Sequence, residues 1–235
     1  MNTANMSDKN ILTDYFNTLT DHLANDPKTR GKKAQILTKI IASYLEPQRK
    51  YHNIKHLIDL FAQYEKASHL IQSRKAVIAM IFFHDIVYNT HIKDLMAGFS
   101  NEEESAKIAE KDLEELGFDK KFITKVARAI RDTSNHLKAN PEDMDTKLFL
   151  DMDMSILDSV WERYERYAFE EIPAEYAEFD VQAFNQRRMS GFLKTCLSLN
   201  SIYKTDLFKE MSKENGYRYK KNLKRELHIR QNLFN

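Results

Sequence analysis

A histidine and an aspartate, His84 and Asp85, directly follow the longest apolar run of the chain, residues 76–83. Burying two groups that bind and release protons in such surroundings is unfavourable unless they have partners. A divalent cation would be such a partner, because neutral imidazole and ionised carboxylate are both metal ligands. The sequence therefore predicts a metal site here, with metal-assisted hydrolysis as its leading chemistry.

Two further histidines, His52 and His56, precede this pair in the stretch Tyr-His-Asn-Ile-Lys-His. Their spacing of four would put both on one face if both were helical. Asn53 is a favoured helix-entry residue, so His56 is expected in the first turn of a helix. Two surface histidines on a polar turn would have the same spacing, and this alternative stays open.

Two aspartates, Asp151 and Asp153, follow later in a second apolar stretch. Residues two apart on a helix point about 200° away from each other. We therefore expect only one of them to face the site, with the other capping a helix or lying in solvent. The spacing alone does not choose between them.

Helices must position these side chains, because apolar residues recur at intervals of three and four almost throughout the chain. With only 5 glycines and 4 prolines, few positions break this pattern. We expect an all-α protein of about ten helices, with a flexible N-terminus over residues 1–10 and a single helical domain over 11–235. One helix should run from about Lys75 to Tyr88 with Ser73 as its cap, a loop should cover 89–99, and the next helix should begin at Ser100.

The bulk composition narrows the functional classes. The 36 basic and 35 acidic side chains leave a net charge of +1, which argues against dedicated nucleic-acid binding. A single cysteine, Cys196, allows no internal disulfide and no cysteine zinc cluster, and it suits a reducing, cytoplasmic setting. The apolar run of eight residues is too short to span a bilayer, so no membrane role is expected. The sequence gives no indication of the oligomeric state.

Taken together, these motifs resemble the HD superfamily of metal-dependent phosphohydrolases. The Tyr-His-Asn-x-x-His stretch at 51–56 is similar to a signature of the cyclic-nucleotide phosphodiesterases, a distant branch, as is Met-Asp-Met-Ser at 152–155. The pattern over residues 44–230 resembles more closely a bacterial family described as predicted metal-dependent HD phosphohydrolases. The stretches that carry this likeness lie at 46–53, 83–88, 101–106, 149–157 and 202–203.

The resemblance implies a helical HD-domain fold, and it implies roles for individual residues. Its metal ligands would be His56, His84, Asp85 and Asp153, with Asp151 as the second candidate for the last position. His52 would be the acid that protonates the leaving group, and Asp85 would also orient the attacking water. The ion would be Mn²⁺, Fe²⁺, Co²⁺, Ni²⁺, Mg²⁺ or Zn²⁺, and the substrate a small phosphomonoester or phosphodiester, with nucleotides as candidates.

Further residues are candidates by their place near the motifs. The one-metal pattern of the superfamily has a glutamate soon after His-Asp, which this sequence lacks, so Glu102 or Glu103 would supply a catalytic carboxylate. Arg49, Lys55 and Arg131 could bind phosphate oxygens. His136 follows the helix that contains Ala129 and Ile130, and the resemblance implies that a histidine there could bind substrate phosphate or a second metal; a plain loop histidine is the alternative.

Two other functions remain as alternatives. A non-catalytic nucleotide sensor would keep the pocket without turnover. A di-iron oxygenase of HD type would need extra ligands, which His136 and a nearby carboxylate could provide.

Overall fold

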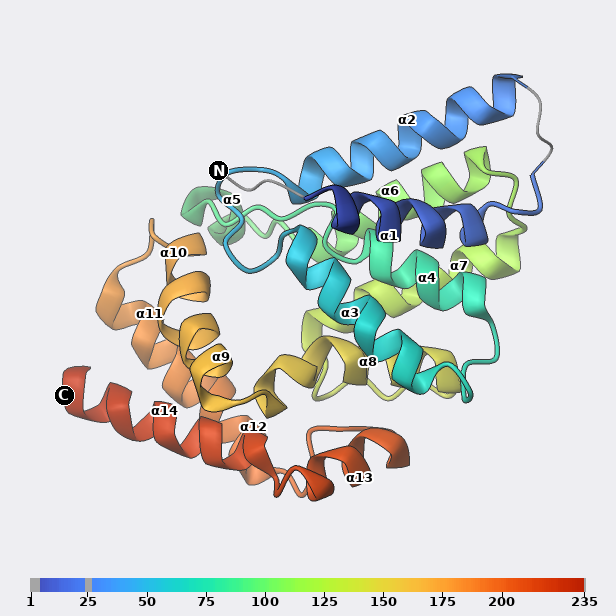
Figure 1. Ribbon diagram of the computed structural model, residues 1–235. Coiled ribbons are helices and arrows are strands. Elements are labelled where there is room, and N and C mark those ends of the chain that lie inside the picture. The colour runs from blue at the N-terminus through green and yellow to red at the C-terminus, as the bar shows by residue number, and fades with distance from the viewer. Residues whose placement is uncertain (1–4, 24–26, 235) are drawn as a thin grey trace.

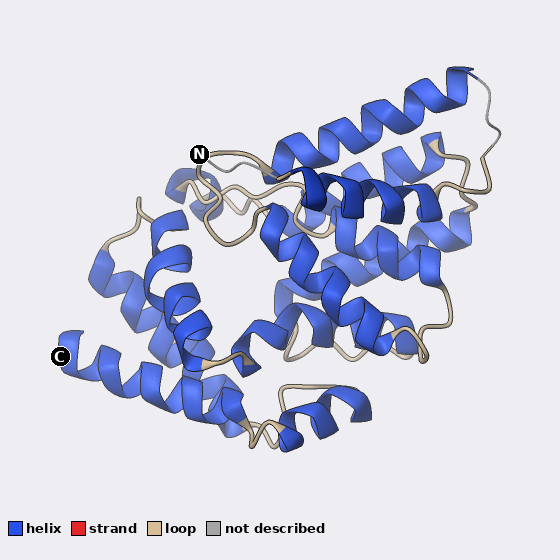
Figure 2. Cartoon of the chain, in the orientation of Figure 1, coloured by secondary structure: helices blue, strands red, loops and turns tan. Residues whose placement is uncertain are grey.

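Every regular element is a helix in the part of the chain that the structure, a computed structural model, describes, residues 5–23 and 27–234 (Figures 1 and 2). The α-helices are α1 (Met6–Leu19), α2 (Pro27–Tyr44), α3 (Ile54–Ala67), α4 (Arg74–Phe83), α5 (Ile92–Met96), α6 (Asn101–Glu115), α7 (Lys120–Asp132), α8 (Met144–Asp153), α9 (Trp161–Arg166), α10 (Ile172–Glu175), α11 (Val181–Arg187), α12 (Lys194–Ser198), α13 (Asp206–Glu214) and α14 (Arg218–Phe234). Two 3₁₀-helices, η1 (Thr133–Asn135) and η2 (Met154–Asp158), and two π-helices, η3 (Tyr167–Glu171) and η4 (Arg188–Leu193), complete the set. The predicted all-α class is confirmed.

The apolar helix α4 forms the centre of the N-terminal helices. All eight of its residues from Ala76 to Phe83 are buried. A helix that is apolar on every side must be covered on every side. Here α1, α3, α6, α7 and α8 surround it (Figure 1). The prediction that His84 and Asp85 follow a buried helix is therefore confirmed.

The C-terminal helices form a second group, drawn in orange and red in Figure 1. α9, η3 and α10 run on without a break, as do α11, η4 and α12, so each π-helix widens one turn of a longer helix. α14 packs across them and contacts α9, α11, α12 and η4. The helical pattern expected beyond residue 160 is thus observed, but the two π-helical turns were not foreseen.

Several helix boundaries differ from the predicted ones. α1 begins at Met6, where Asn5 accepts a hydrogen bond from the Asp8 amide, so part of the expected flexible N-terminus is helical, and residues 1–4 lie outside the described part. α4 ends at Phe83 rather than near Tyr88. The expected loop contains the short α5, which, with the π-helical turns, gives more helical segments than predicted.

The predicted start of α6 is confirmed, since the Ser100 hydroxyl caps it by accepting from the Glu103 amide at 3.2 Å. Ser73 does occupy the position before α4, but its hydroxyl makes no capping bond. The buried Asp145 carboxylate accepts from the Gln72 and Ser73 amides instead. Among the helices of the described residues, none combines the length and apolar character needed to cross a bilayer.

Candidate metal centre and its cavity

Three helices and the turn after one of them bring four side chains close together between α3, α4 and α8. His56 lies in the first turn of α3, which Asn53 caps by accepting from the Lys55 amide at 2.9 Å. His84 ends α4, and Asp85 follows it in the turn. Asp153 is the last residue of α8. The structure thus brings together all four residues predicted as ligands.

The ligand atoms are spaced as a single ion requires. His84 Nε2 lies 3.1 Å from both His56 Nε2 and Asp85 Oδ2, and Asp153 Oδ1 lies 3.2 Å from His56 Nε2. The longer separations are 3.8 Å from His84 Nε2 to Asp153 Oδ1 and 3.9 Å from His56 Nε2 to Asp85 Oδ2. Ligands about 2.1 Å from an ion lie about 3.0–3.4 Å apart at right-angle to tetrahedral bond angles. The three shorter separations fall in this range, and His56, His84 and Asp85 form a group that could hold a divalent ion, with Asp153 beside it.

The tautomer of His84 also fits a ligand. Its Nδ1 lies 3.0 Å from the Ile81 carbonyl oxygen, which can only accept, so Nδ1 carries the proton. The lone pair of the neutral ring is then on Nε2, which faces the cluster. Metal-binding histidines are commonly oriented by such a carbonyl behind the ring. We conclude that His56, His84 and Asp85, with Asp153 beside them, can hold a metal ion.

The charges of the cluster are strongly coupled. Burial alone would raise the pKa of Asp85, but His84 and His52 hold it well below its usual range. Burial would lower the pKa of His84, yet Asp85 and Asp153 raise it to about 9. In the absence of a cation, a proton on the His84 imidazole partly balances the carboxylates. A divalent ion would take over this role, because it can neutralise both carboxylates at once.

Asp151, the second candidate for the last ligand, points away from the cluster. Its carboxylate accepts from the Lys204 amide and from the amide and hydroxyl of Thr205, each at 2.7 Å. Burial raises its pKa to about 6 despite these bonds. The expectation that only one of the two aspartates faces the site is confirmed. Asp151 ties α8 to the segment that leads into α13.

His52 stands beside the cluster rather than in it. Its Nε2 lies 3.9 Å from Asp85 Oδ2, and its Nδ1 lies 2.7 Å from Glu175 Oε2. The other Glu175 oxygen accepts from the backbone amides of Lys50, Tyr51 and His52 at 2.7–2.9 Å. Burial would lower the pKa of His52, but the Glu175 and Asp85 charges outweigh it and raise that pKa. Stacking on Tyr88, with ring centres 4.0 Å apart, fixes the imidazole plane.

Arg49, predicted to bind substrate, is instead a buried clamp between the two motifs. Its guanidinium donates to the carbonyls of His52, Asp85 and Ile86, at 3.3, 2.6 and 3.0 Å. These bonds capture the backbone after α4, which explains why the helix stops at Phe83. The side chain is fully buried, so this prediction is corrected: Arg49 positions the site and does not line the cavity.

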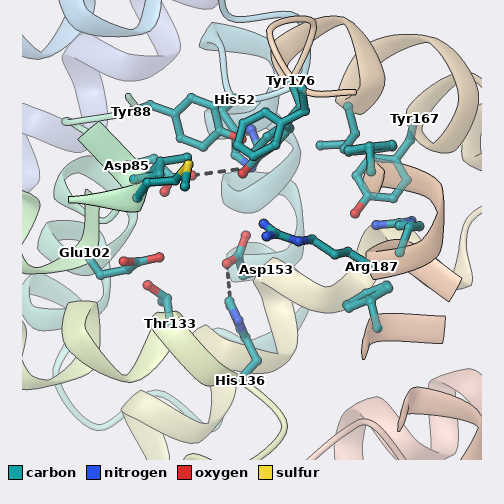
Figure 3. A pocket seen from close by; sticks show the side chains of 17 residues that line it. His52, Asp85, Tyr88, Glu102, Thr133, His136, Asp153, Tyr167, Tyr176 and Arg187 are labelled. Carbon is teal, nitrogen blue, oxygen red and sulfur yellow. Dashed lines mark hydrogen bonds and ion pairs between the residues drawn. The ribbon is translucent and has the colours of Figure 1, made fainter. Parts of the chain in front are cut away.

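A cavity of about 560 Å³ opens over the cluster. Figure 3 shows its polar end, where His52, Asp85 and Asp153 face the interior. Thr133, Glu102 and His136 extend this end. Aromatic rings, together with a few aliphatic side chains, form the rest of the lining; the rings belong to Tyr88, Tyr167, Tyr176, Phe179, Phe184 and Phe192. The volume is that of a small-molecule site.

Three other predicted residues have different placements. His136 lines the cavity, and its Nε2 lies 2.7 Å from Asp153 Oδ2, so it orients that carboxylate. Arg131 forms ion pairs with Glu103 and Glu110 and does not line the cavity. Lys55 is exposed on α3, also outside the lining. Substrate contact is therefore withdrawn for Lys55 and Arg131 and stays a prediction for His136.

The predicted catalytic carboxylate also shifts by one position. Both oxygens of Glu103 are engaged by Arg131, at 2.7 and 3.0 Å, and Glu103 is not part of the lining. Its neighbour Glu102, named with it as a candidate, does line the cavity. If α6 supplies a carboxylate to the site, Glu102 is placed to do so.

Two residues of the site have no counterpart among the predicted ones. Glu175 is 123 positions from His52, and only the packing of α10 against the turn before α3 brings them together. Arg187 lines the cavity from the end of α11. The sequence signal available for Arg187 was its place in a pair of adjacent arginines within a helical pattern of apolar residues. No local pattern marks Glu175.

Comparisons with known proteins add no assignment: no family model, no curated protein and no solved structure matches this chain.

Proposed function

We propose that this chain is a metal-dependent phosphohydrolase of the HD type, acting on a small phosphate ester. One observation carries the proposal: two histidines and two aspartates converge at the polar end of a cavity, with a glutamate-held histidine beside them. Hydrolysis of a phosphate ester needs a nucleophile, a charge sink and a leaving-group acid. The first two are properties of a bound divalent ion, and the third is a property of His52.

The mechanism follows from the surroundings of each group. A bound divalent ion supplies activated water at neutral pH and neutralises charge on the phosphoryl oxygens. His52 gives the proton on Nε2 to the leaving oxygen. Glu175 holds the proton on Nδ1 and so keeps the ring charged and correctly oriented before transfer. Asp85, the cluster residue nearest His52, would orient the attacking water, and His136 would keep Asp153 in its ligating orientation.

The aromatic walls would hold the organic part of the ester. Tyr176 and Phe184 face the cavity with their rings 5.8 Å apart between centres. Such walls exclude water and favour flat or apolar groups, since stacking adds to the gain from apolar burial. Nucleotides remain candidates on this ground, as do other aryl or apolar phosphate esters.

The test is metal analysis combined with a substrate panel. Metal-free protein is loaded separately with Mn²⁺, Fe²⁺, Co²⁺, Ni²⁺, Mg²⁺ and Zn²⁺, and retained metal is measured after desalting. Each form is then assayed for release of phosphate or alcohol from phosphomonoesters, phosphodiesters and nucleotides. We expect retention of about one ion per chain, or two if His136 shares a second, and turnover with at least one metal. Asp85→Ala should abolish metal retention and turnover.

Each contrary outcome points to a defined alternative. Loss of every metal from the wild-type protein would contradict the proposal. Retained metal with nucleotide binding and no product would indicate a sensor. Two irons per chain with oxygen consumption would indicate an oxygenase.

A further inference from the structure

Two consecutive arginines, Arg187 and Arg188, line the cavity where α11 passes into the π-helix η4. Figure 3 shows the Arg187 side chain extending into the cavity in the direction of Asp153. Within the described part of the chain, the Arg187 guanidinium makes no hydrogen bond or ion pair. A guanidinium offers five N–H donors in a planar fork that matches phosphate oxygens. Its position suits binding of an anion that enters the cavity.

Arg188, in contrast, belongs to a buried ionic cluster behind the wall. It donates to both oxygens of Glu226 at 2.9 and 3.2 Å, and Arg230 donates to the same carboxylate at 2.7 Å. Two guanidinium groups against one carboxylate leave an excess of 2 − 1 = +1. The other partners of the cluster, Tyr164 and Asn185, are neutral. The excess charge is almost fully buried, and Arg188 is the member that borders the cavity.

Buried excess charge is unfavourable unless an opposite charge comes near it. With Arg187, this wall contributes about two positive charges to the cavity, facing the end where phosphoryl transfer would occur. Among the described residues that line the cavity, Glu102 is the one carboxylate besides Asp85 and Asp153, and it comes from α6 and not from this wall. The two arginines therefore favour an anionic ligand with more than one negative charge.

We propose that Arg187 binds the phosphoryl group of the substrate and makes the site selective for phosphomonoesters over phosphodiesters; this rests on the proposed function. A monoester carries close to two negative charges at neutral pH and has three free phosphoryl oxygens. A diester carries one charge and has two. The additional oxygen and charge of a monoester strengthen its binding to Arg187. The excess positive charge of the Arg188 cluster attracts the same anion. The placement of both residues at the entry to a π-helix suits this role, since π-helical turns are common at functional sites.

The first experiment measures binding without turnover. Inorganic phosphate, a dianion near neutral pH, is titrated calorimetrically into the metal-loaded protein. Arg187→Gln should weaken phosphate binding by about 10- to 100-fold, the loss expected for charge-assisted hydrogen bonds, with retained metal unchanged. Arg166→Gln is the matched control, because Arg166 is an exposed arginine on α9 outside the cavity lining. It should leave phosphate affinity unchanged.

The second experiment compares two esters with one leaving group. p-Nitrophenyl phosphate and methyl p-nitrophenyl phosphate differ in charge and in one free oxygen. We expect wild-type kcat/KM to favour the monoester, and Arg187→Gln to reduce that preference by at least about 10-fold. A wild-type preference for the diester, or an unchanged ratio and phosphate affinity in Arg187→Gln, would overturn the inference. If neither ester is hydrolysed with any metal, the proposed function fails, and the phosphate titration alone still decides whether Arg187 binds the anion.

Discussion

At the scale of single residues, the pairing of His52 with Glu175 separates a proton donor from the ligands around it. The Glu175 carboxylate is almost completely buried and satisfies three backbone amides as well as His52 Nδ1. His52 therefore cannot turn its Nδ1 toward the cluster without leaving a buried carboxylate oxygen without its partner. Nε2 is the atom that remains available to a substrate.

This geometry predicts different phenotypes for the two histidines of the turn before α3. His52→Ala should retain metal and lose turnover by about 10²–10⁴-fold, the usual range for general acid catalysis. The loss should be smaller for nitrophenyl esters, whose leaving group needs little protonation. His56→Ala should lose both metal and turnover. Metal content and kcat of both variants, measured with one activated and one unactivated ester, check the prediction.

Glu175→Gln is the companion variant for His52. The amide can still accept from the backbone amides, but it cannot hold a charged imidazole. We expect metal retention with a loss of turnover that is again larger for the unactivated ester.

Reversed roles of His52 and His56 would appear as an empty metal site in His52→Ala and a filled one in His56→Ala.

The sequence motifs predicted the residues of the candidate cluster but not the residues that support them. His56, His84, Asp85 and Asp153 lie in short motifs at or beside helix ends, and the resemblance of these motifs to the HD superfamily supplied the set. Glu175 contacts His52 across 123 positions of sequence, and Arg187 reaches the cavity from a helix beyond both. Their roles depend on how α10 and α11 pack, which local periodicity does not encode. The same reason explains why Arg49 was taken for a substrate ligand: its burial follows only from the fold.

At the scale of elements, the turn between α2 and α3 is locked to the turn after α4. The hydroxyl of Tyr44, the last residue of α2, accepts from the Asp85 amide at 3.2 Å. Arg49 donates to the carbonyl oxygens of Asp85 and Ile86. The two motifs of the metal centre are thereby held by backbone contacts and do not depend on the ligands alone. This predicts that the site is largely formed before metal binds.

Arg49→Met should break this lock. The change leaves buried carbonyl oxygens without donors, which we expect to lower the free energy of unfolding by about 2–5 kcal/mol. Urea denaturation of the metal-free protein measures this directly. Arg49→Lys keeps the charge but cannot reach several carbonyls at once, so its free energy of unfolding should lie between those of wild type and Arg49→Met. Wild-type stability in Arg49→Met would show that the lock contributes little.

The C-terminal helices depend on a different anchor, the Glu226 carboxylate between η4, α9 and α14. Burial alone would raise its pKa, but Arg188, Arg230 and the Tyr164 hydroxyl lower it below the ordinary value of 4.5. A carboxyl whose pKa is lowered by folding stabilises the protein above its unfolded pKa. That contribution is lost as the pH falls through the folded pKa.

We therefore expect stability to decline below about pH 4.5 and Glu226→Gln to flatten that decline. At neutral pH, where Glu226 is charged, the variant should be less stable than wild type by about 3–5 kcal/mol, because two arginines lose their buried partner. Denaturation curves from pH 3 to 7 provide the measurement. Glu210→Gln, at an exposed position on α13, should follow the wild-type curve. An identical acid slope in Glu226→Gln would contradict the assignment.

Helix patterning was a reliable guide at this scale except where side chains override it. Apolar spacing predicted the helical course on both sides of residue 160, and Asn53 and Ser100 cap their helices as expected. The end of α4 was misplaced because Arg49 captures the next carbonyls. The π-helical turns were missed because a widened turn changes the period over only a few residues.

At the scale of the whole molecule, the cavity lies where the N-terminal helices meet the C-terminal ones. The ligands and His52 come from the first group, while Tyr167, Tyr176 and Arg187 come from the second (Figure 3). The lining of the cavity is thus divided between the two groups. Sequence analysis predicted one continuous helical domain, but it could not indicate this division, because no change of composition marks it.

The metal centre should also stabilise the molecule as a unit, since its ligands join α3, α4 and α8 around the core. A ligand that binds only the folded state stabilises it by about 2.7 kcal/mol at a concentration of 100 times Kd. For a chain of this size each kcal/mol corresponds to about 2–4 °C, so the retained metal should raise Tm by roughly 5–11 °C. Calorimetry with and without the metal identified by loading measures the shift.

The shift, and not the absolute Tm, is the informative quantity. Asp85→Ala and Asp153→Asn remove a negative charge from a crowded cluster, so either variant could itself be more stable than metal-free wild type. Both should lose the metal-induced shift, because an ion facing two imidazoles and one carboxylate is held more weakly. Asp206→Asn, at a fully exposed position on α13, should keep the full shift. A shift of equal size in all four proteins would place the metal elsewhere, and it would remove the basis for assigning His56, His84, Asp85 and Asp153 to one centre.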